Sequence, residues 1–199
     1  DKQLPYLDME EEKNPFLGLR GVRLLLKNEE LLRTQIKAIL RLSGHHKIRI
    51  LIPMVTLPEE VQTVRNILQL CQNELGLKST PELGAMIETP ANLFTLDQLI
   101  AHVDFISIGT NDLIQYVMAA GRENQQVVEY YQKGDKLIID IIRDIVNATH
   151  KKNKECSLCG EIASETDMIK QLLKVGLRVF SVSPYYIPEI KAAIRCLGR

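Results

Sequence analysis

The stretch LGAMIETPANLFTLDQLIAHVDFISIG (83–109) decides the fold of this chain. It holds two short apolar runs, at 83–88 and 104–109, on either side of a segment at 90–101 whose pattern predicts a helix. Nearly continuous apolar character predicts strands that are buried on both faces, which is typical of parallel sheets. A strand, a helix and a second strand in this order predict a parallel βαβ unit with a right-handed crossover.

The same alternation extends over the rest of the chain. Further apolar runs at 49–54, 155–160 and 179–184 bring the predicted strands to five. Helical patterns lie at 28–43, 58–75, 112–119, 135–152, 164–175 and 187–196. Two α/β architectures have this order of elements, a doubly wound sheet and a (β/α)8 TIM barrel. A complete barrel needs eight strands and about 250 residues, so a barrel here would lack roughly its first third.

Composition excludes several classes of protein. The 199 residues hold 25 Lys and Arg against 25 Asp and Glu, and 45% of them are hydrophobic. The balanced charge gives no electrostatic reason to expect nucleic acid as a partner. The longest apolar runs, such as 137–142, are far shorter than the roughly 18 residues of a membrane span. Four cysteines in a chain of this length indicate reduced thiols. We therefore expect a cytoplasmic α/β domain without membrane insertion.

Carboxylates follow two neighbouring predicted strands. Glu88 ends the run at 83–88, and Asp112 follows the run at 104–109. Because functional groups of parallel α/β folds lie at the carboxyl ends of strands, both residues should reach one rim. Mg²⁺ in proteins takes one or two carboxylates together with substrate oxygens and water, so this pair is a candidate magnesium site. The structural alternative is that Asp112 caps the next helix and Glu88 pairs with an arginine.

Cys156 and Cys159 have the spacing of a zinc or redox motif, but one such pair without a second is weak support for a metal site. On a strand, residues three apart point to opposite faces, so only Cys159 should reach the rim. Two arginines are candidates for binding a phosphate or carboxylate: Arg20 lies between two glycines, and Arg122 follows Gly121. The alternative for each is an ordinary surface charge.

Several segments together resemble a known family. They are NPFLGLRGVR (14–23), IPM (52–54), GAMIETP (84–90), DFISIGTNDLIQY (104–116), LCGEIAS (158–164) and FSVSP (180–184). In this order they are similar to the phosphoenolpyruvate-binding barrel of the enzyme I family, the phosphoenolpyruvate–protein phosphotransferases of bacterial sugar uptake. The segment DKQLPYL (1–7) also resembles this family. The resemblance covers nearly the whole chain and implies a (β/α)8 barrel of the phosphoenolpyruvate/pyruvate type.

The resemblance also implies roles for the rim residues. Glu88 and Asp112 would hold Mg²⁺, and the Asn111 side chain and Asp112 backbone would bind substrate oxygens. Arg20 and Arg122 would clamp the phosphoryl and carboxylate ends of phosphoenolpyruvate. In this family Asp-Arg is usual where this chain has Gly121-Arg122.

For Cys159 the resemblance implies a proton donor that converts the enolate to pyruvate. A histidine on a separate N-terminal domain would take the phosphoryl group and pass it to a histidine-containing phosphocarrier protein. Family members dimerise through this barrel, so a homodimer is expected.

Two features of the family are missing from residues 1–199, the phosphohistidine domain and the first barrel strands. We expect a single, N-terminally truncated barrel domain, a natural protein that is longer at its N-terminus, and no turnover by the isolated chain. Two alternatives remain open. One is a fragment of pyruvate phosphate dikinase or phosphoenolpyruvate synthase. The other is a non-catalytic module that senses phosphoenolpyruvate.

Overall fold

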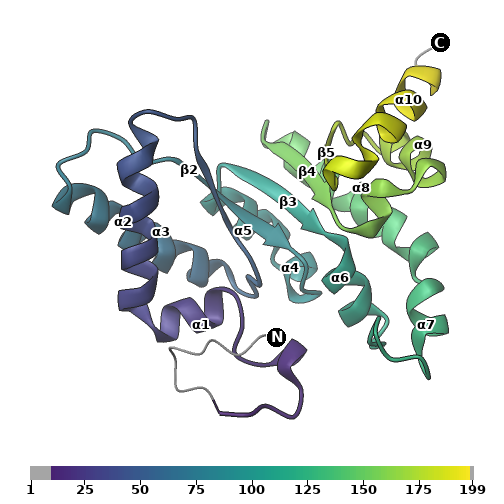
Figure 1. Ribbon diagram of the computed structural model, residues 1–199, viewed down its shortest axis with the longest axis horizontal. Coiled ribbons are helices and arrows are strands. Elements are labelled where there is room, and N and C mark those ends of the chain that lie inside the picture. The colour runs from purple at the N-terminus through teal and green to yellow at the C-terminus, as the bar shows by residue number, and fades with distance from the viewer. Residues whose placement is uncertain (1–9, 198–199) are drawn as a thin grey trace.

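A computed structural model describes residues 10–197, so the segment at 1–7 that resembles the enzyme I family lies outside the described residues. Five strands form one sheet in the order β1-β2-β3-β4-β5, and every neighbouring pair is parallel (Figure 1). The strands are β1 (Arg49–Ile52), β2 (Glu82–Ile87), β3 (Phe105–Gly109), β4 (Glu155–Cys159) and β5 (Val179–Ser181).

This strand order separates the two architectures. A doubly wound sheet reverses its strand order at a switch point, whereas here each strand pairs with the next one along the chain. Parallel pairing in chain order is the arrangement of a (β/α)8 barrel wall. The predicted fold class, α/β with a barrel-type parallel sheet, is therefore confirmed.

The side chain of Arg49 shows that the sheet curls. From the start of β1 its guanidinium bonds Glu82 on β2, with Nε 2.7 Å from Oε2, and also contacts Glu155 on β4. It lies over the ring of Phe105 on β3, 3.8 Å from the ring centroid. In a flat sheet β1 and β4 would be about 14 Å apart, since neighbouring strands are about 4.8 Å apart. One side chain can reach all four strands because the sheet is concave on this face.

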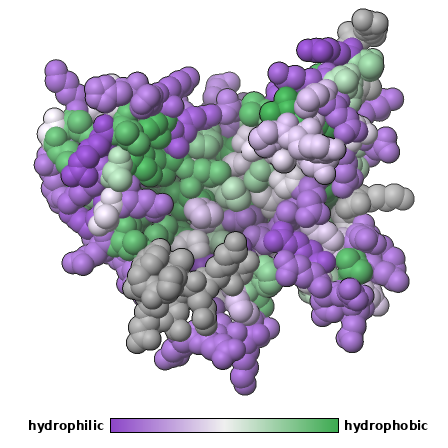
Figure 2. All heavy atoms as spheres, viewed as in Figure 1, coloured by the Kyte–Doolittle hydropathy of each residue, from purple (hydrophilic) through white to green (hydrophobic). Residues whose placement is uncertain are grey.

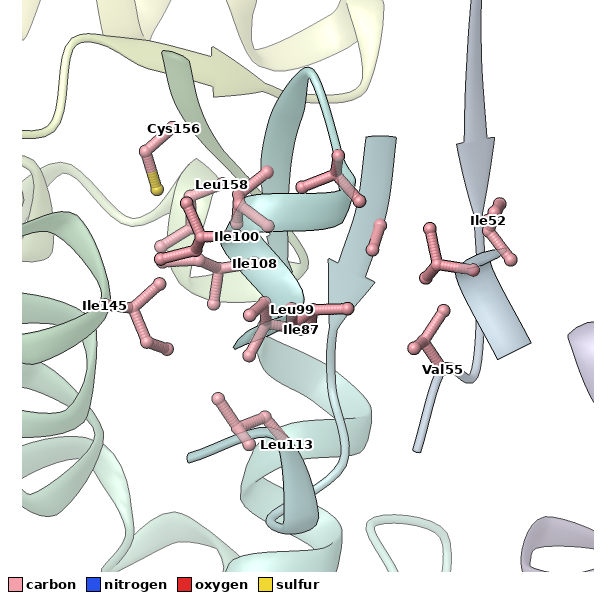
Figure 3. Packing of buried hydrophobic residues seen from close by; sticks show 14 of the residues in the cluster. Ile52, Val55, Ile87, Leu99, Ile100, Ile108, Leu113, Ile145, Cys156 and Leu158 are labelled. Carbon is pink, nitrogen blue, oxygen red and sulfur yellow. The ribbon is translucent and has the colours of Figure 1, made fainter. Parts of the chain in front are cut away.

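The two faces of the sheet differ in composition. On the convex face, apolar side chains pack against helices α3, α5 and α8; Figure 3 shows Ile108 of β3 in one cluster with Ile100 of α5 and Ile145 of α8. On the concave face the strands carry small or polar residues, such as Ser107 and Ser157, which face each other in register. The hydrophobic core therefore lies between the sheet and the helices, and the concave face carries the side chains that could bind a polar ligand.

Ten helices and three 3₁₀ turns accompany the sheet in the described part of the chain. The helices are α1 (Val22–Lys27), α2 (Glu29–Ser43), α3 (Pro58–Glu74), α4 (Ala91–Phe94), α5 (Leu96–His102), α6 (Thr110–Val117), α7 (Val128–Gln132), α8 (Asp135–Lys151), α9 (Thr166–Lys174) and α10 (Ile187–Leu197). The turns are η1 (Pro15–Leu17), η2 (Glu161–Ser164) and η3 (Pro184–Tyr186). Within the described residues, no helix has the length and apolar character needed to cross a bilayer.

The structure differs from the predicted helices at three places. The single helix predicted at 90–101 is broken at Thr95, whose hydroxyl bonds the Ala91 carbonyl and whose backbone leaves the helical region (φ −115°, ψ 15°). Side chains of this kind compete with the helical ladder. Helices α1 and α7 were not predicted, because six and five residues are too few to display a helical period.

Substitution of Gly84 tests how closely side chains pack on the concave face of the sheet. A Cβ at this position would lie 2.4 Å from the Phe105 ring, which is itself covered by the Arg49 guanidinium. We expect Gly84→Ala to lower the free energy of unfolding in urea by about 1–3 kcal/mol, the usual cost of overpacking. Gly44→Ala is the matched control, since no atom lies within 4 Å of its added methyl group and its φ is −69°. Equal stability of the two variants would contradict the close packing of the Phe105 ring over Gly84.

Candidate functional site

Arg20 and Asp112 form an ion pair at the carboxyl rim of the sheet. Arg20 lies in the loop before α1, and Asp112 lies in the first turn of α6, directly after β3. The Nη2 atom of Arg20 is 3.0 Å from Oδ2 of Asp112, and the side chains are only 18% and 13% exposed. Shielding from water makes this pair stronger than an exposed surface pair. The ion pair thus links the loop before α1 to the start of α6, although Arg20 and Asp112 are 92 residues apart in sequence.

Besides Asp112, Tyr116 is a second residue that holds the Arg20 side chain. The sequence patterns did not predict this role of Tyr116. Its hydroxyl accepts a hydrogen bond from Nη1 of Arg20 at 3.1 Å and donates one to the Phe16 carbonyl. The Arg20 guanidinium also lies 5.5 Å from the centre of the Phe16 ring. Tyr116 follows Asp112 by four residues on α6, so both side chains lie on one helix face. That spacing is a signal that could have revealed the residue.

Glu88 lies beside the ion pair and is almost fully buried, with 5% of its surface exposed. Its Oε1 atom accepts a hydrogen bond from the Met54 backbone N–H at 2.6 Å. Burial, reinforced by the negative charge of Asp112, raises the pKa of Glu88 to about 7, while the Met54 bond and Arg20 oppose that rise. Gly109 leaves room for the carboxylate, because a Cβ there would lie 2.8 Å from Oε2.

The Arg20 loop docks on the end of β1 through a tight backbone contact. The Val22 N–H donates to the Pro53 carbonyl at 3.1 Å. Gly21 has a φ of +56°, and an added Cβ would lie 2.7 Å from the Cβ of Met54. Met54 itself has a φ of 58°, a strained value for a residue with a side chain. A glycine next to Arg20 therefore permits the close approach that places the arginine at the rim.

Cys159 ends β4 in register with Gly109 of β3, so its side chain faces the same rim as Glu88. Its Sγ atom lies 3.5 Å from the Ile108 carbonyl. Burial raises the pKa of the Cys159 thiol; the charges of Glu88 and Asp112 raise it further, and a Ser107 hydrogen bond opposes the rise. At neutral pH this sulfur therefore carries its proton.

Cys156 faces the other way, toward the helices, as the strand period requires. It is buried next to Thr149 of α8, and burial raises the pKa of its thiol to about 12. The two cysteines of the motif are therefore not paired. Over residues 10–197, no three His, Cys, Asp or Glu side chains converge as a metal cage.

Asn111 and Arg122 lie apart from the carboxylate cluster. Oδ1 of Asn111 accepts a hydrogen bond from the Glu161 N–H at 2.9 Å. The Arg122 backbone N–H donates to Gln115, and its Nε is 3.9 Å from the Glu123 carboxylate. Asn111 and Arg122 line a separate pocket of about 520 Å³, together with Glu123 and Glu161. The structure thus joins Arg20, Glu88, Asp112 and Cys159, while the part of Arg122 in substrate binding stays a prediction.

The carboxylate pair suits Mg²⁺. This ion keeps several waters and takes one or two protein carboxylates together with substrate oxygens, so a cage of three or more protein ligands is unnecessary. The contacts of the described residues engage one oxygen of each carboxylate, Oε1 of Glu88 and Oδ2 of Asp112. The second oxygens, Oε2 and Oδ1, are the donors that a divalent cation would use.

The shifted pKa of Glu88 predicts how stability depends on pH. A carboxyl group whose pKa rises from 4.5 in the unfolded chain to about 7 in the fold stabilises the fold fully below pH 4.5 and loses this contribution as pH rises through 7. We expect the free energy of unfolding to fall by on the order of 3 kcal/mol over this range relative to Glu88→Gln, which cannot ionise. Urea unfolding of both proteins at several pH values checks this; parallel curves would contradict it.

Comparison with known proteins establishes the family. The family model of the PEP-utilising enzyme, PEP-binding domain, matches residues 1–198. A phosphoenolpyruvate-protein phosphotransferase of Listeria monocytogenes is 43% identical over 100% of this chain and 36% of its own length. One from Buchnera aphidicola is 40% identical over 98% of the chain and 35% of its length. The chain therefore spans about a third of these relatives.

A citrate lyase structure from Burkholderia xenovorans LB400 shares the fold. Its TM-score is 0.64 at 20% identity, over 81% of this chain and 53% of that one. At this identity the likeness concerns the fold alone, which is that of TIM-barrel-like α/β proteins. The family match along nearly the whole sequence is the decisive result, and the chain belongs to the PEP-binding domain family of PEP-utilising enzymes.

Proposed function

We propose that this chain is the phosphoenolpyruvate-binding domain of a cytoplasmic, homodimeric phosphoenolpyruvate–protein phosphotransferase. The phosphoryl group passes to a histidine of the same protein and then to a histidine-containing phosphocarrier protein, the first steps of sugar uptake. The observation that carries the proposal is the convergence of Arg20, Glu88, Asp112 and Cys159 on one rim. Relatives that bear this name, at 43% and 40% identity, favour it over a dikinase or a synthase.

The domain is proposed to continue in a longer barrel. Beside β1, at the edge of the sheet, lies a groove of about 310 Å³, whose lining includes Val22 of α1, Ile36 of α2 and Ile50 of β1. Figure 2 shows hydrophobic side chains gathered next to α2 on this face. A preceding strand and helix would pair with β1 and cover this apolar groove. The relatives, of which the chain spans 36% and 35%, have the length for such a segment.

Binding of the substrate rests on complementary charge. Phosphoryl transfer needs positioning and charge neutralisation more than covalent help from the protein. Glu88 and Asp112 would hold Mg²⁺, which when bound neutralises the phosphoryl and enolate oxygens. Arg20 offers a planar guanidinium that can bond two oxygens of a phosphoryl group at once. The shielded position of the Arg20 side chain, 18% exposed, strengthens such a contact.

Cys159 completes the reaction by proton transfer. When the P–O bond of phosphoenolpyruvate breaks, the phosphoryl group goes to the histidine nitrogen and the electron pair stays on the enolate oxygen. The enolate C3 then takes the proton from the Cys159 Sγ–H, which yields pyruvate and a thiolate that water reprotonates. Burial raises the pKa of the Cys159 thiol and so keeps the proton in place at neutral pH.

The two cysteines of β4 provide a matched test. In the full-length protein that contains this domain, we expect Cys159→Ala to lower the rate of pyruvate formation by at least about a hundredfold, the usual size of an acid–base contribution. Phosphoenolpyruvate binding should change little, since Cys159 is not a substrate clamp. Cys156→Ala, on the opposite face of the strand, should retain turnover although it loses some stability.

Stopped-flow assay of pyruvate and calorimetric titration of phosphoenolpyruvate measure the two effects. Loss of binding in Cys159→Ala would refute the role of proton donor. Unchanged turnover of that variant would refute it as well. A full-length protein that binds phosphoenolpyruvate but forms no pyruvate would instead favour a module that senses phosphoenolpyruvate.

A further inference from the structure

Arg20 is paired with one of the two carboxylates of the proposed metal site. Its Nη2 atom lies 3.0 Å from Oδ2 of Asp112, next to the buried carboxyl of Glu88. In the part of the chain that the structure describes, no other lysine or arginine forms an ion pair with either carboxylate. The guanidinium is thus the resident counter-ion of Asp112.

A divalent cation and this guanidinium compete for Asp112. Like charges within a few ångströms of one another repel strongly where water is largely excluded, and the ion pair is only 13–18% exposed. A cation that binds Asp112 therefore weakens the Arg20 contact, and Arg20 in turn weakens the binding of the cation. Coupling of this kind is reciprocal and typically changes affinity by about 5–150-fold.

The second anchor of Arg20 does not depend on Asp112. Nη1 donates to the Tyr116 hydroxyl, which is itself held by the Phe16 carbonyl, and the guanidinium lies over the Phe16 ring. If Nη2 leaves Asp112, these contacts keep the guanidinium at the rim. Its Nη2 atom then becomes available to a phosphoryl oxygen.

We propose that Arg20 is an exchangeable counter-ion. When a divalent cation binds Asp112, the Arg20 guanidinium leaves Asp112, and the Tyr116 hydroxyl keeps the guanidinium at the rim, where it binds the phosphoryl group of the substrate. Tyr116 is accordingly a positioning residue that acts through Arg20. The inference rests on the proposed function, because it takes Asp112 as a metal ligand. It adds that substrate and metal binding are linked through the exchange of one ion pair.

Arg23, in the first turn of α1, provides a matched control close to Arg20 in sequence. Its guanidinium donates to the carbonyls of Leu17 and Gly18 and to the Thr56 hydroxyl, so it contacts neutral acceptors only. Arg23→Gln therefore removes an arginine three residues away without changing the charge beside Asp112.

The first experiment measures Mn²⁺ binding to the purified chain by electron paramagnetic resonance, without substrate and at one pH. We expect Arg20→Gln to bind Mn²⁺ about tenfold more tightly than the wild type, since a competing cation is gone. Arg20→Lys, which keeps the charge, and Arg23→Gln should stay within about threefold of the wild type. Thermal melts without metal show whether each variant is folded.

The second experiment measures phosphoenolpyruvate binding by calorimetry at saturating Mn²⁺. We expect Tyr116→Phe to bind the substrate about tenfold more weakly, while its affinity for Mn²⁺ alone stays within about threefold of the wild type. A purely structural role of Tyr116 would weaken both.

The outcomes separate the inference from the proposed function. If Arg20→Gln and the wild type bind Mn²⁺ equally well, or if Tyr116→Phe binds phosphoenolpyruvate normally, the exchange is overturned and the proposed function stands. If the folded wild type binds neither Mn²⁺ nor phosphoenolpyruvate, the site proposed for this chain is overturned, and the exchange with it.

Discussion

Parallel pairing of consecutive strands is the constraint on which the site depends. Because β2, β3 and β4 run in one direction, Glu88, Asp112 and Cys159 all reach the same rim. The sheet is also curled, as the contacts of Arg49 with β2, β3 and β4 show at the amino ends of the strands, so that its inner face is concave. Two carboxylates are thereby brought together in a place with little water. Burial, reinforced by the charge of Asp112, raises the pKa of Glu88 to about 7, and Arg20 pairs with Asp112 in the same place.

Much of the fold could be predicted from the sequence, because strands buried on both faces leave long apolar runs between helical patterns. All five predicted strands are present, although β1 ends at Ile52 and β5 at Ser181, before the predicted ends. The pattern of elements left the choice between barrel and doubly wound sheet open, since both have the same order of elements, and only the family resemblance predicted the barrel. Strand pairing decides it, and pairing joins segments that are far apart in sequence, which local patterns do not show.

The site was partly predictable, because strand ends can be located from local patterns. Glu88, Asp112 and Cys159 were identified in this way, and their chemical roles remain predictions. Tyr116 was not predicted, because its spacing from Asp112 does not by itself show the contacts with Arg20 and the Phe16 carbonyl, which lie 96 and 100 residues away in sequence. The separation of Arg122 from the carboxylates could not be predicted either. Asn111 bonds the Glu161 backbone, and together with Arg122 it lines a pocket whose lining includes neither Glu88 nor Asp112.

A thermal melt of this chain with phosphoenolpyruvate and Mg²⁺ together, and with each alone, tests the central claim most directly. Ligand at about 100 times its dissociation constant stabilises the fold by about 2.7 kcal/mol, which raises the melting temperature of a domain of this size by roughly 5–10 °C. We expect a rise of this size that requires both components and is absent in Glu88→Ala. A cooperative melt of the wild type that neither component moves, alone or together, would contradict the claim that these residues assemble the site.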